Sequence, residues 1–273
     1  MTLFNKAYIL NLGNKKPPVQ VGKFHLGGNF LKVIICDDYK SQSAAGADII
    51  EKIVREKPDC CLGLATGSSP VGMYKELARR CAEEGLDFSR VSSVNLDEYA
   101  GLEPTHPQSY RYFMDTNLFD HINIDKKNTY VAKGVGDADA NIAEFRAKLA
   151  ESDVDLQVLG VGPDGHLGFN EPGDTLWDMA HKEVLDESTI DANARFFDTR
   201  DDVPRFAFTM GMGDIMRAKK LLLIISGNKQ DAARQLLMDE KVSTKCPATF
   251  MKLHRDAVVF IEKKLADEIG YKG

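Results

Sequence analysis

From residue 31 onward, short apolar runs alternate with longer segments of helical periodicity, and this alternation limits the folds open to the chain. The apolar or extended runs are 31–36, 60–65, 91–96, 129–132, 154–159, 206–209, 220–225 and 257–261. The helical segments are 41–56, 71–84, 108–118, 138–151 and 231–239, with one more after 261. Parallel strands need crossover connections of this kind. The sequence therefore predicts an α/β fold with a single doubly wound, mostly parallel sheet and helices on both faces.

Residues 1–30 do not share this pattern. They also lack the basic start, the long apolar centre and the small-residue cleavage site of a signal peptide. We expect residues 1–30 to be an extension outside the core fold and residues 31–273 to form a single domain. Deleting residues 1–30 is therefore expected to leave activity and melting temperature nearly unchanged.

Composition narrows the class of protein and of partner. A chain of 273 residues with 43% hydrophobic and 28% charged residues can bury a full core. Its formal net charge of -6 argues against binding to nucleic acid or to an anionic membrane, although a small anion could still bind locally. No apolar run reaches the roughly 18 residues needed to span a bilayer, so a cytoplasmic location is expected. The five cysteines lack the spacing of a zinc site or a disulfide scaffold, and we expect reduced thiols.

The loop 160–172, which follows the apolar run 154–159, carries three proton-handling side chains. Asp164, His166 and Glu171 come just after a predicted strand, at the end where open α/β sheets bind ligands. The pKa of histidine lies near neutral pH, and flanking carboxylates can orient its ring and hold a proton near it. A simple turn would explain the glycines, the proline and the aspartate, but not the histidine and glutamate that follow. We interpret the three residues as one catalytic unit.

A second loop, 64–70, joins a predicted strand to a predicted helix. Thr66, Ser68 and Ser69 offer hydroxyl groups, and the helix N-terminus adds free N–H groups and the positive end of its dipole. Gly67 allows close approach of a ligand. This combination indicates a phosphate cradle, although no Gly-Lys-Ser/Thr closes it, so a nucleoside triphosphate is not expected. The alternative is a structural, Ser/Thr-rich helix cap.

Charged residues follow other predicted strands. Asp97 and Glu98 come directly after the run 91–96. Either carboxylate could be a general base, because burial or a neighbouring negative charge raises its pKa; the alternative is the acidic start of a helix. Arg195 lies between apolar residues and Lys229 follows the run 220–225, and both cations could hold a phosphate. Taken singly, each could equally be a surface charge.

Together these motifs resemble the glucosamine-6-phosphate deaminase family, and the resemblance covers nearly the whole chain from Leu31 onward. The matching segments, in the family's order, are LATGSSP, NLDEYAGL, SYRYFM, GVGPDGHLGFNEPG, ANARFF and LLLIISGNK. The resemblance implies a Rossmann-like sheet of the sugar-phosphate isomerase and deaminase type. It also implies a cytoplasmic enzyme that converts glucosamine 6-phosphate and water to fructose 6-phosphate and ammonia without a metal or an organic cofactor. The family includes monomers and hexamers, which leaves a homo-oligomer open.

The same resemblance implies a role for each residue singled out above. His166 would assist opening of the sugar ring, with Asp164 and Glu171 holding and tuning it. Asp97 would take the C2 proton, and Glu98 would support the electrostatics of Asp97. The phosphate would be held by Ser68, Ser69, Arg195 and Lys229, and Thr66 and Gly67 complete the substrate-binding set.

Two departures from the family pattern alter the expectations. Lys229 follows Gly227 by two residues, where the family commonly has three, and a one-residue deletion would explain the difference. Allosterically activated members have Ser, Arg and Lys at positions where this chain has Asp174, His181 and Glu183. Two of these three are acidic and would repel a phosphate. We therefore expect no activation by N-acetylglucosamine 6-phosphate, and hyperbolic kinetics.

Two other functions stay open at this point. The 6-phosphogluconolactonase family shares the fold and a Gly-x-Asp-Gly-His loop, but its reaction needs no C2 base and its loop typically continues differently. Asp97 and Glu171 therefore favour the deaminase. A non-catalytic sugar-phosphate sensor, as found in transcriptional regulators, would normally carry a helix-turn-helix domain and a basic patch, for which residues 1–30 are too few.

Overall fold

The computed structural model of the chain describes residues 20–26 and 29–273, and it describes side chains from residue 31 onward except at 188 and 192. Most of the expected extension lies outside the described residues, so the domain boundary at Leu31 stays a prediction. The described part of the extension includes strand β1 (Gln20–Leu26), which pairs antiparallel with β2 (Asn29–Cys36). Any truncation in this region would therefore remove or shorten an edge strand of the sheet.

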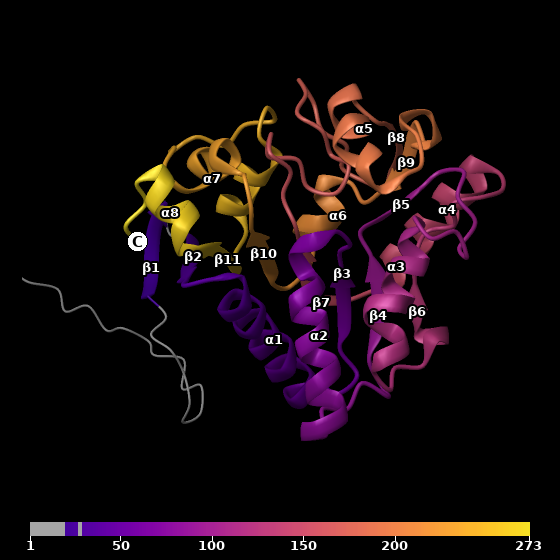
Figure 1. Cartoon of the computed structure of the whole chain (residues 1–273), viewed down its shortest axis with the longest axis horizontal. Coiled ribbons are helices and arrows are strands. Elements are labelled where there is room, and N and C mark those ends of the chain that lie inside the picture. Colours follow the sequence, from indigo (N-terminus) through magenta and orange to yellow (C-terminus); the bar gives the residue numbers. More distant parts are fainter. Residues whose placement is uncertain (1–19, 27–28) are drawn as a thin grey trace, which may run out of the picture.

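One large sheet organises the molecule (Figure 1). Its strand order is β1-β2-β11-β10-β7-β3-β4-β6, and all of its strands except β1 run parallel. The remaining strands are β3 (Cys61–Leu64), β4 (Ser92–Asn95), β6 (Thr129–Tyr130), β7 (Val154–Leu159), β10 (Leu221–Ile225) and β11 (Ala257–Glu262). The predicted doubly wound, mostly parallel sheet is confirmed. In β10 every residue is apolar and buried, as expected for a parallel strand that is covered on both faces.

Helices connect these strands. The α-helices are α1 (Tyr39–Glu56), α2 (Ser68–Glu84), α3 (Tyr110–Asn117), α4 (Ala138–Glu151), α5 (Glu187–Asn193), α6 (Met212–Met216), α7 (Gln230–Leu237) and α8 (Lys263–Ile269). The 3-10 helices are η1 (Phe119–His121), η2 (Lys126–Asn128), η3 (Ala194–Phe196), η4 (Arg200–Asp202) and η5 (Pro247–Leu253). No helix of the described residues is both long and apolar enough to cross a membrane.

The winding of the chain places a binding crevice at the centre of the sheet. From β2 to β6 the chain moves toward one edge, and from β7 through β10 to β11 it moves back toward the other. Because such crossovers are right-handed, the two halves put their helices on opposite faces. The direction changes between the neighbouring strands β3 and β7, and the loops after these two strands diverge there. Open α/β sheets bind their ligands at this kind of point.

A second, smaller sheet lies beside the carboxyl ends of the large one (Figure 1). Its strands β5 (Asp97–Tyr99), β9 (Phe206–Thr209) and β8 (His181–Val184) pair antiparallel in that order. The strand at 206–209 was expected, but β5, β8 and helix α5 were not. Only Leu96 separates β5 from β4, so the two strands resemble a single run in the sequence. The small sheet has its own apolar cluster, formed by Tyr99, Phe169, Leu185, Ile190, Val203 and Ala207.

Candidate active site

A cavity of about 380 Å³ opens where the winding changes direction. The loops that follow β3, β4, β7 and β10 line it, and the α5–η3 segment closes one side. Nine of the ten residues predicted from the sequence line this cavity: Thr66, Gly67, Ser68, Ser69, Asp97, Asp164, His166, Arg195 and Lys229. The tenth, Glu171, lies behind His166, with its Oε2 3.3 Å from the Nδ1 of the histidine. The fold therefore brings together residues that are far apart in the sequence.

Asp97 is the candidate base, and it is nearly inaccessible to solvent. The residue is 6% exposed, and its Oδ1 has no hydrogen-bond partner among the described residues. Burial first, and then the negative charge of Glu98, raise the pKa of Asp97 to about 8, and His166 opposes that rise. A carboxylate with a pKa in this range is a far better proton acceptor near neutral pH than an exposed one.

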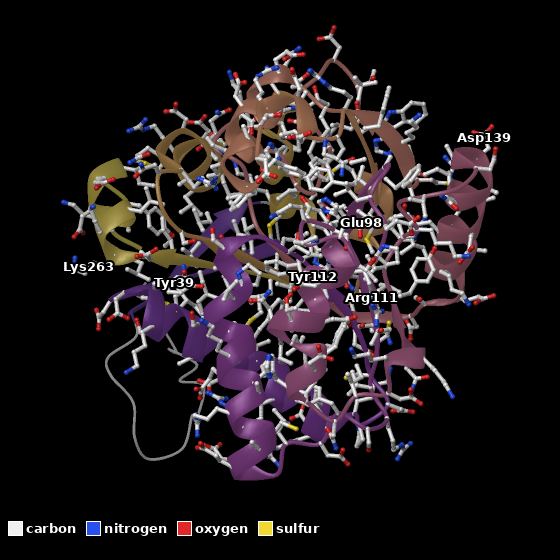
Figure 2. All side chains as sticks on the ribbon, turned by 45° about the vertical axis from the view of Figure 1, so that its right-hand side comes forward. Tyr39, Glu98, Arg111, Tyr112, Asp139 and Lys263 are labelled. Carbon is white, nitrogen blue, oxygen red and sulfur yellow. The ribbon has the colours of Figure 1, made fainter. Side chains whose placement is uncertain are left out.

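Glu98, the next residue, points to the start of helix α3 (Figure 2). Its carboxylate accepts hydrogen bonds from the backbone N–H groups of Tyr99 at 2.8 Å, Tyr110 at 2.8 Å and Arg111 at 3.0 Å. Burial raises the pKa of Glu98 to about 7, although these donors oppose the rise. The negative charge beside Asp97 is therefore fixed in place by the N-terminus of a helix.

His166 contacts two carboxylates through one ring nitrogen. Its Nδ1 lies 2.9 Å from Oδ1 of Asp164 and 3.3 Å from Oε2 of Glu171. Burial by itself would lower the pKa of His166, but the two carboxylates outweigh it and raise that pKa to about 9. The histidine in turn lowers the pKa of Asp164 against the opposing effect of burial. The two carboxylates thus favour the protonated form of the ring.

Gly162, in the loop that follows β7, has a steric role. A Cβ atom on Gly162 would lie 2.2–2.5 Å from three atoms of the His166 ring. Such contacts are far too short, so any side chain here would displace the imidazole. The space beside Gly162 is therefore occupied by the histidine ring.

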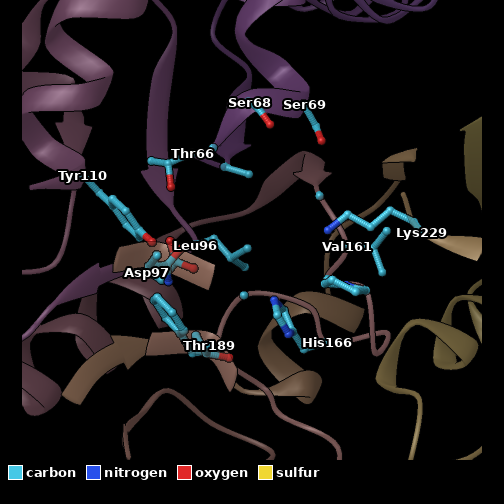
Figure 3. A pocket seen from close by; sticks show the side chains of 18 of the residues that line it. Thr66, Ser68, Ser69, Leu96, Asp97, Tyr110, Val161, His166, Thr189 and Lys229 are labelled. Atoms are coloured by element: carbon cyan, nitrogen blue, oxygen red, sulfur yellow. The ribbon is translucent and has the colours of Figure 1, made fainter. Parts of the chain in front are cut away.

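Hydroxyl groups and cations gather at the other end of the cavity (Figure 3). Helix α2 begins at Ser68, directly after Gly67, whose φ of 86° lies in the left-handed region that favours glycine. The Oγ of Ser69 lies 3.0 Å from the Oγ of Ser226, which joins the loops after β3 and β10. Free N–H groups at the start of α2 and these hydroxyls form a site suited to an anion.

Two cations complete this end. Lys229 immediately precedes α7, and Figure 3 shows its side chain reaching into the cavity. Burial lowers the pKa of Lys229, Asp164 opposes that change, and the neighbouring Arg195 adds to it. Arg195 is exposed in η3 and lies over the ring of Phe196, 4.7 Å from its centroid. An anionic ligand would relieve the repulsion between the two cations.

Several residues of the cavity wall escaped the sequence analysis. They include Tyr110, Thr189, Asn193 and Ser226. Tyr110 and Asn193 belong to matched motifs, and Ser226 directly follows a predicted strand, so position could have drawn attention to those three. Thr189 lies on the unpredicted helix α5, and its Oγ1 donates a hydrogen bond of 2.8 Å to Oε1 of Glu171. Its place in the site depends on tertiary packing alone.

The same donor set could in principle bind a cation. One ligand atom from each of Asp164, His166 and Glu171 lies within 4.8 Å of the others. A metal would need the neutral ring, whereas the two carboxylates favour the protonated one. The set therefore suits a proton better than a metal ion.

This geometry supports a definite kind of chemistry. The buried carboxylate of Asp97, a histidine with two carboxylates, and a separate group of hydroxyls and cations share one cavity. Such a site can bind a small phosphorylated molecule at one end and move protons on its carbon skeleton at the other. Fold and site together define an α/β protein built for acid–base chemistry on a small anionic ligand.

Comparison with known proteins gives the family. Residues 40–260 match the model for glucosamine-6-phosphate isomerases and 6-phosphogluconolactonases, and the chain belongs to this family. It is 48% identical to a glucosamine-6-phosphate deaminase of Clostridium perfringens over 238 residues, which is 86% of this chain and 98% of that protein. It is 45% identical to a glucosamine-6-phosphate deaminase of a Thermoanaerobacter species over 242 residues, 88% of this chain and 95% of the relative.

Solved structures agree with this assignment. A monomeric glucosamine-6-phosphate deaminase superposes with a TM-score of 0.83 at 39% identity, covering 86% of this chain and 98% of that one. A 6-phosphogluconolactonase from Trypanosoma brucei superposes with a TM-score of 0.68 at 15% identity, covering 87% and 98% of the two chains. The second likeness shows only a shared fold.

Proposed function

We propose that this chain is a glucosamine-6-phosphate deaminase, which converts glucosamine 6-phosphate and water to fructose 6-phosphate and ammonia. The observation that carries the proposal is the buried Asp97, in one cavity with the His166 cluster and a separate anion site. Relatives at 45–48% identity that bear this name support it. The reaction needs only proton transfers and water, so no metal or organic cofactor enters the proposal.

In the first step the closed sugar must open. Opening transfers a proton from the C1 hydroxyl to the ring oxygen, and His166 can carry that proton because Asp164 and Glu171 stabilise the charged ring. Asp97 then removes the proton from C2, which gives an enolamine. Return of a proton to C1 gives a ketimine, and water adds at C2 with release of ammonia. Each proton removed is returned or leaves with the product, so the steps balance.

The phosphate lies far from the reacting carbons and serves to position them. Ser68, Ser69, Arg195 and Lys229 would hold it, with Thr66 and Gly67 beside the sugar. Binding energy from a non-reacting group can fix the C2 carbon against the base. Figure 3 shows Ser68 and Ser69 on one side of the cavity and Asp97 and His166 on another, so a phosphate and the reacting carbons of one sugar could occupy different parts of it.

The structure also bears on activation by a second sugar phosphate. His181 and Glu183 pair with each other, with Nε2 and Oε2 2.8 Å apart, and Asp174 pairs with Lys245 at 2.7 Å. Asp174 and Glu183 are acidic and His181 already pairs with Glu183, so none of the three side chains offers a free donor to a phosphate. We accordingly propose that the enzyme has hyperbolic kinetics and is not activated by N-acetylglucosamine 6-phosphate. Separately, we propose that it acts in the cytoplasm, as the family resemblance implies.

One assay tests the main proposal. Purified protein is given glucosamine 6-phosphate, and ammonia and fructose 6-phosphate are measured together in coupled assays. Equal amounts of both products support the proposal. Failure to release ammonia, with rapid hydrolysis of 6-phosphogluconolactone instead, would make the chain a lactonase. Binding of the sugar phosphate without either reaction would make it a sensor.

A further inference from the structure

One short helical segment touches both ends of the cavity. Helix α5 (Glu187–Asn193) continues without interruption into η3 (Ala194–Phe196). Its first turns carry Thr189, which contacts the His166 cluster through Glu171, and its last turn carries Arg195, which faces the anion site. A displacement of this segment at one end would therefore be felt at the other.

The end of the cavity that holds Asp97 and His166 is called the proton-transfer end, and the contact that Thr189 makes there is specific. Glu171 offers one oxygen to each neighbour, because Oε1 accepts the hydroxyl of Thr189 at 2.8 Å and Oε2 lies 3.3 Å from Nδ1 of His166. Thr189 is 5% exposed and the Glu171 side chain is 8% exposed, so water does not readily replace this hydrogen bond. The hydroxyl thus determines how the carboxylate faces the histidine.

The rest of the segment is attached to the small sheet. Ile190 packs in the small apolar cluster with Leu185 and Val203, outside the large core. On its outer face, Glu187 and Asp191 pair with Arg200. An element held by a small cluster and by exposed ion pairs resists displacement weakly, since exposed pairs contribute little to stability. A ligand bound to Arg195 would therefore add a substantial part of the restraint on the segment.

We propose that Thr189 is a positioning residue that couples phosphate binding at Arg195 to the orientation of Glu171 and His166. The proposal rests on the proposed function and assigns a role within it. When phosphate binds, Arg195 fixes α5, Thr189 holds Oε1 of Glu171, and Oε2 supports the charged ring during opening of the sugar. The phosphate then contributes to the rate of the chemical steps as well as to affinity.

The test separates the phosphate from the sugar. Glucosamine, which lacks the phosphate, is given to the enzyme with and without inorganic phosphate, and ammonia release is measured. The variants are Thr189→Val, which keeps the shape and removes the hydroxyl, and Thr189→Ser, which keeps the hydroxyl. Thr116→Val, on the exposed face of α3, makes the same substitution away from the cavity.

In the wild-type enzyme, and in the Thr189→Ser and Thr116→Val variants, inorganic phosphate is expected to raise kcat/KM for glucosamine about tenfold. This is within the usual range of coupling between sites. In Thr189→Val this rise is expected to be lost, while inorganic phosphate still inhibits turnover of glucosamine 6-phosphate, with an inhibition constant equal to or somewhat larger than that of the wild type because coupling between sites is reciprocal. Activation that persists in Thr189→Val, or is absent from the wild type, would overturn the proposal. So would a complete loss of inhibition by inorganic phosphate in Thr189→Val, because Thr189 would then be part of the anion site itself.

A double-mutant cycle gives a second measure that needs no activity on glucosamine. Thr189→Val and Arg195→Ala are compared singly and together for kcat with glucosamine 6-phosphate. If the two residues are coupled, the fold-loss of kcat in the double variant should be smaller than the product of the two single fold-losses, by about fivefold or more. Multiplicative losses would contradict the coupling. Failure of the wild type to release ammonia from glucosamine 6-phosphate would instead refute the proposed function, so the two failures are distinguishable.

Discussion

The two ends of the cavity differ in how they are built. At the proton-transfer end, Asp97 and Glu98 are buried and each has a raised pKa. At the anion end, Ser68 and Arg195 are exposed, and the site consists of hydroxyls, a helix N-terminus and two cations. Proton transfer near neutral pH requires a base whose affinity for protons has been changed, and exclusion of water achieves that. Holding a phosphate requires only donors in the right directions.

This difference predicts how each end responds to substitution. Changes at the proton-transfer end should reduce kcat, because in the proposed mechanism they alter groups that act in the transition state. Changes at the anion end should act on KM as well, because the phosphate is bound in both the ground state and the transition state.

The largest effect is expected from Asp97→Asn. The amide keeps the shape of the side chain but cannot accept the C2 proton, so kcat should fall on the order of 10²–10⁴-fold. Steady-state ammonia release measures this, and calorimetric titration with fructose 6-phosphate shows whether the anion end still binds. Asp120→Asn, an exposed change of the same kind, serves as the control. A variant that keeps more than half of its turnover would mean that Asp97 is not the base.

Gly162→Ala should come next. A Cβ at this position would collide with the His166 ring, and a misplacement of about 1 Å can cost about 10²-fold in rate. Gly160→Ala is the matched control on the same loop, because a Cβ there meets nothing within 4 Å. The comparison of kcat between the two variants isolates the position of the histidine from the general effect of losing a glycine. Because Gly160 also lines the cavity, its variant shows the effect of a methyl group in the cavity without displacement of the ring. Wild-type kcat in Gly162→Ala would show that the ring position is unimportant.

These residues also show how much of the fold and of the site could be predicted from the sequence. Strands such as β10 were predictable because burial on both faces demands a continuous apolar run. Asp97, His166 and Lys229 were predictable as site residues because each follows such a strand, and parallel strands end at the same edge. Their roles stay proposals that the variants test.

Other features were beyond the sequence for physical reasons. Strand β8 at the edge of the small sheet has three consecutive polar residues before Val184 and so lacks the alternation typical of a strand, and α5 has only seven residues, too few for a clear period. Thr189 contacts Glu171 because Ile190 anchors α5 in a cluster with five other buried residues, several of them distant in the sequence. No local pattern records a contact set by such packing.

At the anion end, Arg195→Lys should have a moderate effect. Lysine keeps the charge but loses the planar fork that can donate two parallel hydrogen bonds to a phosphate. Loss of one hydrogen bond to a charged group should lower kcat/KM about tenfold, with KM rising. Arg90→Lys, in an exposed loop, controls for the substitution. An unchanged KM would place the phosphate elsewhere in the cavity.

The smallest effect is expected from Glu98→Gln, and it should appear as a shift in pH dependence rather than as a loss of rate. If Asp97 is the base as proposed, it acts only when deprotonated, so kcat/KM should rise with pH through its pKa of about 8. Glu98 has a lower pKa, about 7, and therefore carries its negative charge across most of that rise. Removing the charge removes a repulsion that raises the pKa of Asp97, so the rise should move to lower pH by a fraction of a unit. Glu103→Gln, exposed and on the same connection, makes an equal charge change and should leave the profile unmoved. A profile that stays in place in Glu98→Gln, with an unchanged melting temperature, would mean that burial alone sets the proton affinity of Asp97.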